Sequence, residues 1–197
     1  MGRRSDHSRA ELEALILGEG HALMAETGYA RFSAREVAKR IGYSIGTIYN
    51  VFGSHNRLVM AINSRTFSLW AAAMRARLDA DPADRMAVLV ESYLDFASAN
   101  PNLWMAIYDH RMSPDEELPE PYARQRSELT GMVEAEIRKV IPPERGDRAQ
   151  PLARSLVATV HGHCAFALTG TFALLGEMDP MGTALARVRE TLAAARG

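Results

Sequence analysis

Helix-start signals recur along the whole chain and limit its fold more than any other feature. Four dipeptides place a capping residue directly before a proline: Asp81-Pro82, Asn100-Pro101, Ser113-Pro114 and Asp179-Pro180. Proline at the first helical position loses no hydrogen bond and already has the required φ, so each dipeptide predicts a helix start. No stretch alternates with the period of a strand, and Asn-Gly and Asp-Gly turns are absent. We therefore expect an all-α fold.

Apolar spacing and end signals predict about nine helices in the 197 residues. We expect them near residues 8–27, 33–41, 44–52, 54–80, 82–99, 101–112, 122–140, 152–175 and 181–195. Segments 113–121 and 142–148 are rich in proline and charge, and are expected to connect helices.

Two short helices joined by a tight turn are expected between residues 33 and 52. Ser33 and Glu36 have the spacing of a capping box, and Gly42 allows a sharp turn. Ile48 and Phe52 have the spacing of a core face in the second helix. Gly46 lies inside this helix, where glycine costs about 1 kcal/mol relative to alanine. Such a pair of helices is the helix-turn-helix pattern, in which the second helix enters the DNA major groove.

Charge is distributed unevenly along a chain whose net charge is only -1. Residues 27–65 contain one acidic residue, Glu36, and six basic ones: Arg31, Arg35, Lys39, Arg40, Arg57 and Arg65. A basic N-terminal third indicates a polyanionic partner for that part of the chain. A solvated charged face is the alternative interpretation.

The stretch F-S-A-R-E-V-A-K-R-I-G-Y-S-I-G-T-I-Y-N-V-F-G-S-H, residues 32–55, resembles the DNA-binding domain of TetR-family transcriptional regulators. The resemblance implies a helix-turn-helix domain over residues 1–53 and a ligand-binding and dimerisation domain over residues 54–197. By matching position it implies phosphate contacts from Ser44, Thr47 and Tyr49. It also implies that the remaining contacts to bases, groove or backbone come from Ser33, Arg35, Ile45, Gly46, Asn50 and His55.

Two residues depart from the family pattern. The family usually has lysine at the position of His55, and lysine, arginine or glutamine at that of Ile45. Ile45 can offer DNA only an apolar contact, such as one to a thymine methyl group. We expect operator preference and affinity to differ at these two positions.

The resemblance also implies a two-fold homodimer on a palindromic double-stranded DNA operator, formed through the last two long helices. The expected interface residues are Leu156, Val160, His163, Ala167, Leu185, Val188 and Leu192. The alternative is that both helices belong to the core of a single chain.

Aromatic and methionine residues gather between residues 67 and 112 and again at Phe166, and the resemblance implies a ligand pocket enclosed by the expected helices from residue 54 to residue 175. The candidate pocket residues are Trp104, Tyr108, His161 and Phe166. Because the apolar stripes carry few charges, we expect a small apolar or aromatic inducer. This inducer would shift the helix over residues 54–80 and release a repressor from its operator. An ordinary hydrophobic core is the alternative interpretation of these residues.

Two other functions remain open at this point. His161 and Cys164 lie three residues apart and could share a metal ion, whereas positions 161 and 163 point about 200° apart on a helix. No catalytic or phosphate-binding motif accompanies them, so we expect no enzyme activity, cofactor or metal. The other alternative is a regulator whose degenerate DNA-binding domain acts through protein partners, which Ile45 and His55 would explain.

A cytoplasmic location is expected. The chain has one cysteine, so no intrachain disulfide is possible. No apolar run approaches the roughly 20 residues of a membrane span, and no apolar segment follows Arg3 and Arg4 as in a signal peptide.

Overall fold

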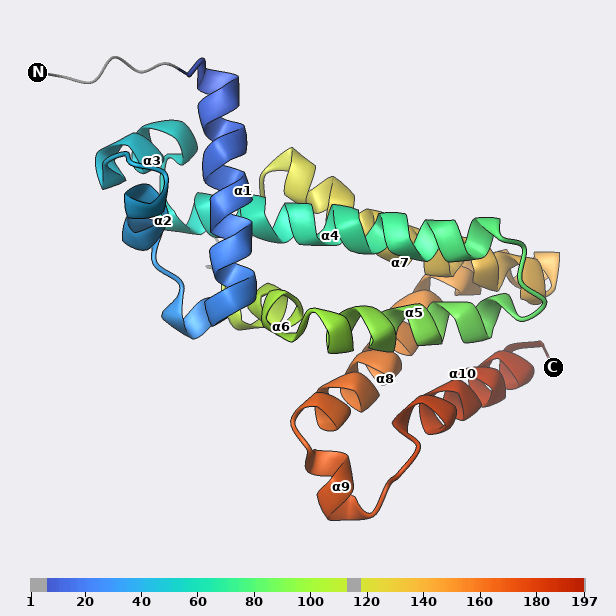
Figure 1. Cartoon of the computed structure of the whole chain (residues 1–197). Coiled ribbons are helices and arrows are strands. Elements are labelled where there is room, and N and C mark those ends of the chain that lie inside the picture. Colours follow the sequence, from blue (N-terminus) through green and yellow to red (C-terminus); the bar gives the residue numbers. More distant parts are fainter. Residues whose placement is uncertain (1–6, 113–117, 197) are drawn as a thin grey trace, which may run out of the picture. The chain divides into compact units, whose positions relative to one another are not determined.

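The computed structural model describes residues 7–112 and 118–196 (Figure 1). In these two ranges the chain forms ten α-helices and two short 3₁₀ helices, with no strand, which confirms the all-α prediction. The chain divides into two compact units. The first contains Met1–Thr66 and Asn100–Ala123, and the second contains Phe67–Ala99 and Arg124–Gly197.

The first unit is built on α1 (Arg9–Thr27), against which α2 (Ala34–Arg40), α3 (Ile45–Phe52) and α6 (Pro101–Asp109) pack. The turn η1 (Tyr29–Arg31) and the first part of α4 (His55–Asp79) complete it. Its core is aliphatic and includes Ile16, Val37, Ile48, Leu58 and Ile62, each fully buried.

Capping in this unit differs from the sequence prediction. Ser33 accepts a hydrogen bond from the Glu36 amide (3.4 Å), but the Glu36 carboxylate pairs with Lys39 and Arg40, so the predicted capping box is only half formed. The complete capping box joins Ser8 and Glu11 at the start of α1. Opposite charges one turn along α2 therefore compete with the cap for the Glu36 side chain.

The second unit contains the rest of α4, α5 (Arg85–Ala99), α7 (Glu120–Val140) from Arg124 on, η2 (Pro143–Arg148), α8 (Ala149–Leu168), α9 (Thr171–Leu175) and α10 (Pro180–Arg196). Helix α10 packs against α5 and α8, and α5 also packs against α8. Glu136 on α7 is buried and accepts a forked pair of hydrogen bonds from Arg85 (2.8 and 2.9 Å). This ion pair fastens the start of α5 to α7.

Helix α5 starts later than Asp81-Pro82 predicts. Asp81 has a φ of 50°, outside the extended conformation typical of an N-cap, and the side chain of Asp84 caps the Ala87 amide instead (2.9 Å). Two of the other dipeptides do begin helices, at Pro101 and Pro180. Ser113-Pro114 lies outside the described residues.

The predicted helix over residues 152–175 is wrong, because α8 ends at Leu168 and α9 is separate. Gly170 adopts a left-handed conformation with φ of 73°, which glycine accepts readily. The Thr169 hydroxyl also bonds to the Ala165 carbonyl (2.8 Å) and to the Thr171 hydroxyl (2.9 Å). Apolar spacing continues through this point, so it did not reveal the break.

The two compact units are defined by which residues pack together. The predicted boundary after residue 53 instead separates a DNA-binding part of the chain from a ligand-binding and dimerisation part. The first unit includes the beginning of α4 and all of α6, which lie beyond that boundary. The functional boundary stays a prediction. Every helix in the described ranges is too short or too polar to cross a membrane.

Candidate nucleic-acid interface and ligand cavity

The turn between α2 and α3 depends on Gly42. Its φ is 75°, and the next amide, that of Tyr43, donates back to the Ala38 carbonyl at 2.9 Å. A side chain at position 42 would be strained in this conformation. The turn therefore joins the two helices in only a few residues, as the helix-turn-helix pattern requires.

Helix α3 is held by one buried residue and capped by one polar residue. Ile48 is fully buried in the core of the first unit. Ser44 accepts from the Thr47 amide (3.1 Å) and shares a hydrogen bond with the Thr47 hydroxyl (3.0 Å). Tyr49 and Asn50 are exposed on the helix. The packing thus leaves a face of hydroxyl and amide groups directed to solvent.

No contact inside the described chain requires glycine at position 46. A Cβ atom there would meet only the Ser44 hydroxyl oxygen, at 3.5 Å, which is an ordinary van der Waals distance. Alanine would also be the better helix former. Packing within the described residues therefore does not explain Gly46, whereas close approach of a partner to the α3 backbone would explain it.

The positive surface is smaller than the sequence count indicates. Arg40 donates to Glu26 at 2.8 and 3.1 Å and to Glu19 at 3.1 Å, so it fastens α2 to α1. Lys39 pairs with Glu36. Among the predicted contact residues, Arg35 is exposed in the first turn of α2.

Three further predicted contact residues, Ser33, Ile45 and His55, take part in the unit's own packing. Ser33 caps α2 and is half-buried. Ile45 packs against the core of the first unit. His55 begins α4 with its ring 5.8 Å from that of Phe32. The aliphatic side chain at position 45 thus has a structural explanation.

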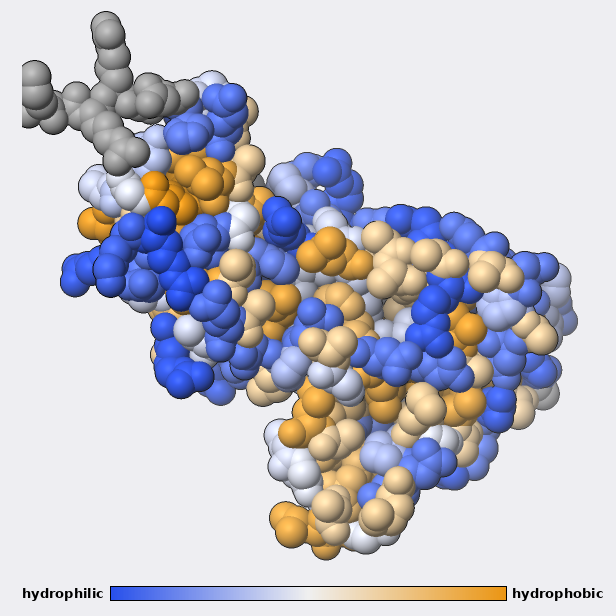
Figure 2. All heavy atoms as spheres, viewed as in Figure 1, coloured by the Kyte–Doolittle hydropathy of each residue, from blue (hydrophilic) through white to orange (hydrophobic). Residues whose placement is uncertain are grey.

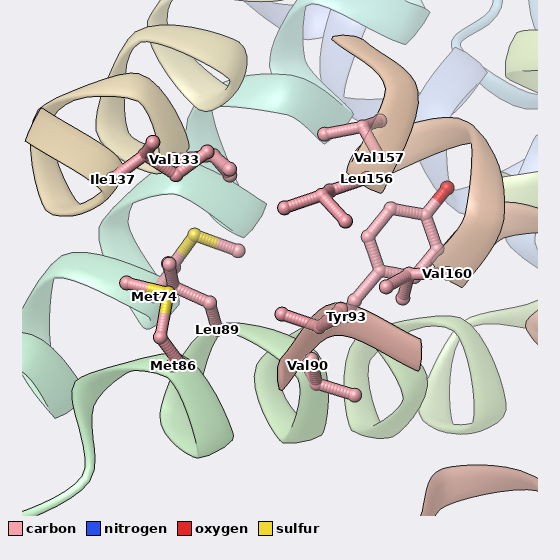
Figure 3. Close-up of a pocket in the computed structure, with 11 residues that line it drawn as sticks. Met74, Met86, Leu89, Val90, Tyr93, Val133, Ile137, Leu156, Val157 and Val160 are labelled. Atoms are coloured by element: carbon pink, nitrogen blue, oxygen red, sulfur yellow. The ribbon is translucent and has the colours of Figure 1, made fainter. Parts of the chain in front are cut away.

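The second unit encloses an apolar cavity of about 40 Å³ (Figure 3). Side chains converge on it from five helices: Met74 of α4, Met86, Leu89, Val90 and Tyr93 of α5, Val133 and Ile137 of α7, Leu156, Val157 and Val160 of α8, and Val188 of α10. A space of this size holds three or four waters at most, since each needs roughly 10–15 Å³. Its lining offers water almost no hydrogen-bonding partner.

An aromatic group lies beside this cavity. The Tyr93 hydroxyl and the His161 Nδ1 atom are 3.1 Å apart, within hydrogen-bonding distance. Trp70 packs edge-on against Tyr93 and stacks on Phe96 with ring centroids 4.9 Å apart. Burial lowers the pKa of His161 below its ordinary value, so the imidazole is neutral at pH 7.

The four candidate pocket residues do not come together around this cavity. Trp104 and Tyr108 belong to the first unit, where their rings lie 5.0 Å apart. His161 does not line the cavity but lies within hydrogen-bonding distance of Tyr93, which does, and Phe166 is 45% exposed. Sequence reasoning missed the valine, leucine and isoleucine lining because it searched for aromatic and sulfur-bearing side chains.

The seven candidate dimer residues fall into two groups. Leu156, Val160, Val188 and Leu192 are at most 6% exposed within the single chain, so they offer a partner almost no surface. The remaining three, His163, Ala167 and Leu185, are partly exposed. One face of α8 thus packs inside the unit while other residues of the same helix remain accessible.

Cys164 has the environment of a structural thiol. It is 1% exposed, and burial raises its pKa to about 11. A thiol with such a pKa carries almost no thiolate at pH 7, so it is a poor nucleophile and metal ligand. No group of three metal-ligating side chains occurs within residues 7–112 and 118–196.

A short amphipathic helix with an exposed polar face, held at a glycine turn on an all-helical unit, defines a DNA-binding protein of the helix-turn-helix class. Residues 16–62 match the family of bacterial regulatory proteins called the tetR family, and residues 86–189 match the tetracyclin repressor-like C-terminal domain. The second match alone covers more than half of the chain. The protein therefore belongs to the TetR family of transcriptional regulators.

Several solved structures share the fold. A protein of unknown function from Rhodococcus sp. RHA1 aligns with a TM-score of 0.74 and 19% identity, covering 100% of both chains. A TetR transcription regulator from Haloarcula marismortui ATCC 43049 aligns at 0.65 and 18%, covering 95% of this chain and 100% of the other. The multidrug binding protein EbrR, complexed with imidazole, aligns at 0.58 and 21%, covering 93% and 96%. The sequence matches none of the curated proteins with which it was compared.

Family membership decides between the functions left open by the sequence. The chain is a DNA-binding transcriptional regulator, and the family is not enzymatic. Membership of this family also implies that the first part of the chain binds operator DNA and that the C-terminal domain binds a ligand.

Proposed function

We propose that this regulator is a homodimeric repressor in the cytoplasm that a small apolar or aromatic molecule releases from a palindromic operator. The observation that carries the proposal is α3, a helix anchored by Ile48 whose other side presents hydroxyl and amide groups and a glycine without an internal purpose. Palindromic operators suit two-fold dimers because each half-site receives one recognition helix.

On this proposal Ser44, Thr47 and Tyr49 contact phosphates, while Gly46 brings the backbone of α3 near the groove. Asn50 faces the bases, since an exposed carboxamide can pair with the edge of adenine. Arg35 reaches a phosphate or a guanine. Ser33, Ile45 and His55 border this surface, where they shape its edge more than they bind.

The inducer would enter the apolar cavity of the second unit. As it stands the cavity is too small for a drug-sized molecule, so a ligand has to displace side chains. Met74 and Met86 can do this at low cost, because methionine is unbranched and flexible. The structural relative EbrR is described as a multidrug binding protein, which supports a cavity that adapts to small molecules.

The route from cavity to DNA would be α4. This helix runs without interruption from His55 to Asp79, and Met74 lines the cavity while Leu58 and Ile62 belong to the core beneath the recognition helix. A ligand that binds one arrangement of α4 more tightly than another shifts the equilibrium between dimers that bind DNA and dimers that do not. The size of the shift is set by the difference between the ligand's affinities for the two arrangements.

The test is selection of genomic fragments by the purified protein, followed by binding titrations on the selected fragment at several salt concentrations. Arg35→Ala should lower affinity and reduce the slope of log affinity against log salt by about 1. Tyr49→Phe, which removes only a hydroxyl group, should weaken binding without disturbing the fold. Arg126→Ala is the control, because Arg126 is an exposed arginine on α7 in the second unit. Failure to select any fragment would refute the proposal.

A further inference from the structure

Three large apolar side chains are displayed to solvent around α9. Leu174 is 89% exposed, Leu175 67% and Met178 86%. We define the α9 arm as residues 171–178. It begins after Gly170 and contains Gly176, both left-handed, so the chain turns sharply at each end of α9. Figure 2 shows the resulting hydrophobic residues gathered over α9.

The arm is attached to its own chain through a different side chain. Phe172 lies with its ring centroid 5.5 Å from those of His163 and Phe166. Leu174, Leu175 and Met178 take no comparable part, as their exposure shows. Packing within the unit therefore does not account for these three residues, and a cluster of exposed apolar side chains indicates an interaction surface.

A groove lies beside the arm. It has a volume of about 370 Å³, and we define the α8 groove by its lining residues, Ala158, Thr159, Gly162, His163, Phe166 and Phe172. A Cβ atom at Gly162 would have no neighbour within 4 Å, so the groove is open at that point. The His163 Nδ1 atom lies 2.8 Å from the Thr159 carbonyl oxygen of its own helix.

The charge pattern matches this surface. No Asp, Glu, Lys or Arg occurs in residues 155–176, although 23 basic and 24 acidic residues occur in the whole chain of 197. The groove residues and the two leucines all lie in this uncharged stretch. The fully buried centres of protein interfaces are depleted of charge in the same way.

We infer that the occupant of the α8 groove is the α9 arm of a second copy of this chain. The same face carries both a projecting apolar arm and an apolar hollow, so a two-fold axis pairs arm with groove twice, as an isologous interface requires. The inference rests on the proposed homodimer and names the surface that forms it. On this inference the dimer contact comes from the arm and the groove, and not from the buried residues Leu156, Val160, Val188 and Leu192.

The test measures dimer dissociation by sedimentation or by light scattering over a wide range of concentration. Leu174→Ser combined with Met178→Ser removes the arm's apolar contacts, and Gly162→Leu fills the groove. Gly162→Leu should also improve helix stability, so a folding defect does not confuse its result. We expect each variant to raise the dimer Kd by about tenfold or more, since a few well-packed residues carry most of the affinity of an interface.

The control is Leu69→Ser, an exposed leucine (48%) on α4 in the same unit, which should leave the Kd unchanged. A wild-type chain that stays monomeric at every concentration would overturn the proposed homodimer, and this inference with it. If the wild type dimerises and either the arm variant or the groove variant leaves the dimer Kd unchanged, only the pairing of arm and groove would be overturned. Weakening by Leu69→Ser to the same extent would also overturn that pairing.

Discussion

Two short helices of this protein expose side chains for opposite reasons. Helix α3 presents hydroxyl and amide groups around a glycine, and it is anchored from behind by the fully buried Ile48. Helix α9 presents leucines and has no residue of its own that is fully buried. A polar surface on a firm anchor suits a charged, hydrated partner such as DNA. An apolar surface on a short arm suits a partner that removes it from water.

The largest expected effect tests how firmly each helix is anchored. Ile48→Ala should lower the free energy of unfolding by about 2–5 kcal/mol, because it leaves a cavity in the core of the first unit. In the dissociated chain, at protein concentrations below the dimer Kd, Leu174→Ala should change it by less than about 0.5 kcal/mol, because the side chain of the single chain is already in water. Urea titrations of both variants measure the difference. Equal effects would remove the contrast between α3 and α9.

The next test concerns the glycine of α3. Gly46→Ala should raise the free energy of unfolding by about 0.5–1 kcal/mol and yet lower operator affinity, since the added Cβ meets the DNA rather than the protein. Gly131→Ala on α7 is the control, because a Cβ there also has open space around it. It should stabilise by a similar amount and leave operator binding alone. If Gly46→Ala bound the operator normally, the backbone of α3 would not approach DNA closely.

A third test compares the interior of the second unit with its exposed arm. Val160→Ile adds one methylene to the wall of a cavity of about 40 Å³ and keeps the branched side chain. We expect a change of less than about 1.5 kcal/mol in unfolding free energy. Operator binding should be unaffected, while a panel of small aromatic molecules should release the operator less effectively. An unchanged response would place the inducer elsewhere.

The smallest expected effect is a dependence of the free energy of unfolding on pH. It arises from one histidine in each unit, His21 in the first and His161 in the second. Burial lowers the pKa of His161, and burial together with the positive charge of Arg65 lowers that of His21. Each imidazole therefore binds fewer protons in the folded state than in the unfolded state, whose ordinary pKa is 6.5. The free energy of unfolding should consequently fall as the pH decreases from about 6.5 toward the lowered values.

Urea unfolding at a series of pH values measures this slope, and NMR titration assigns it to each histidine. His161→Gln and His21→Gln should each flatten part of the dependence. A titration of either histidine at or above pH 6.5 would contradict its assignment.

Local signals predicted the helix-turn-helix well because its determinants are local. Gly42 and the Ser44 cap act within a few residues, and both can be read directly from the sequence. The same kind of signal failed at Asp81-Pro82, where Asp84 caps α5 instead. The residue beside that cap, Arg85, bonds to Glu136 on another helix, a contact that the local sequence does not reveal.

The cavity and the dimer surface were harder to predict because they depend on which way each helix faces. Val160 and His163 lie three residues apart on α8, yet one lines the cavity and the other lines the groove. Apolar spacing groups such residues on one broad stripe. Only the packing of α5 and α10 against α8 divides that stripe into an inner and an outer part.

The burial of Cys164 has a practical consequence. It is the chain's only cysteine, and its high pKa and lack of exposure keep it from reacting with thiol reagents while the protein is folded. The natural sequence is therefore a ready background for spectroscopic probes. A single cysteine introduced on α3 or on the α9 arm would carry the only accessible label, and each helix could be followed separately without altering the interior.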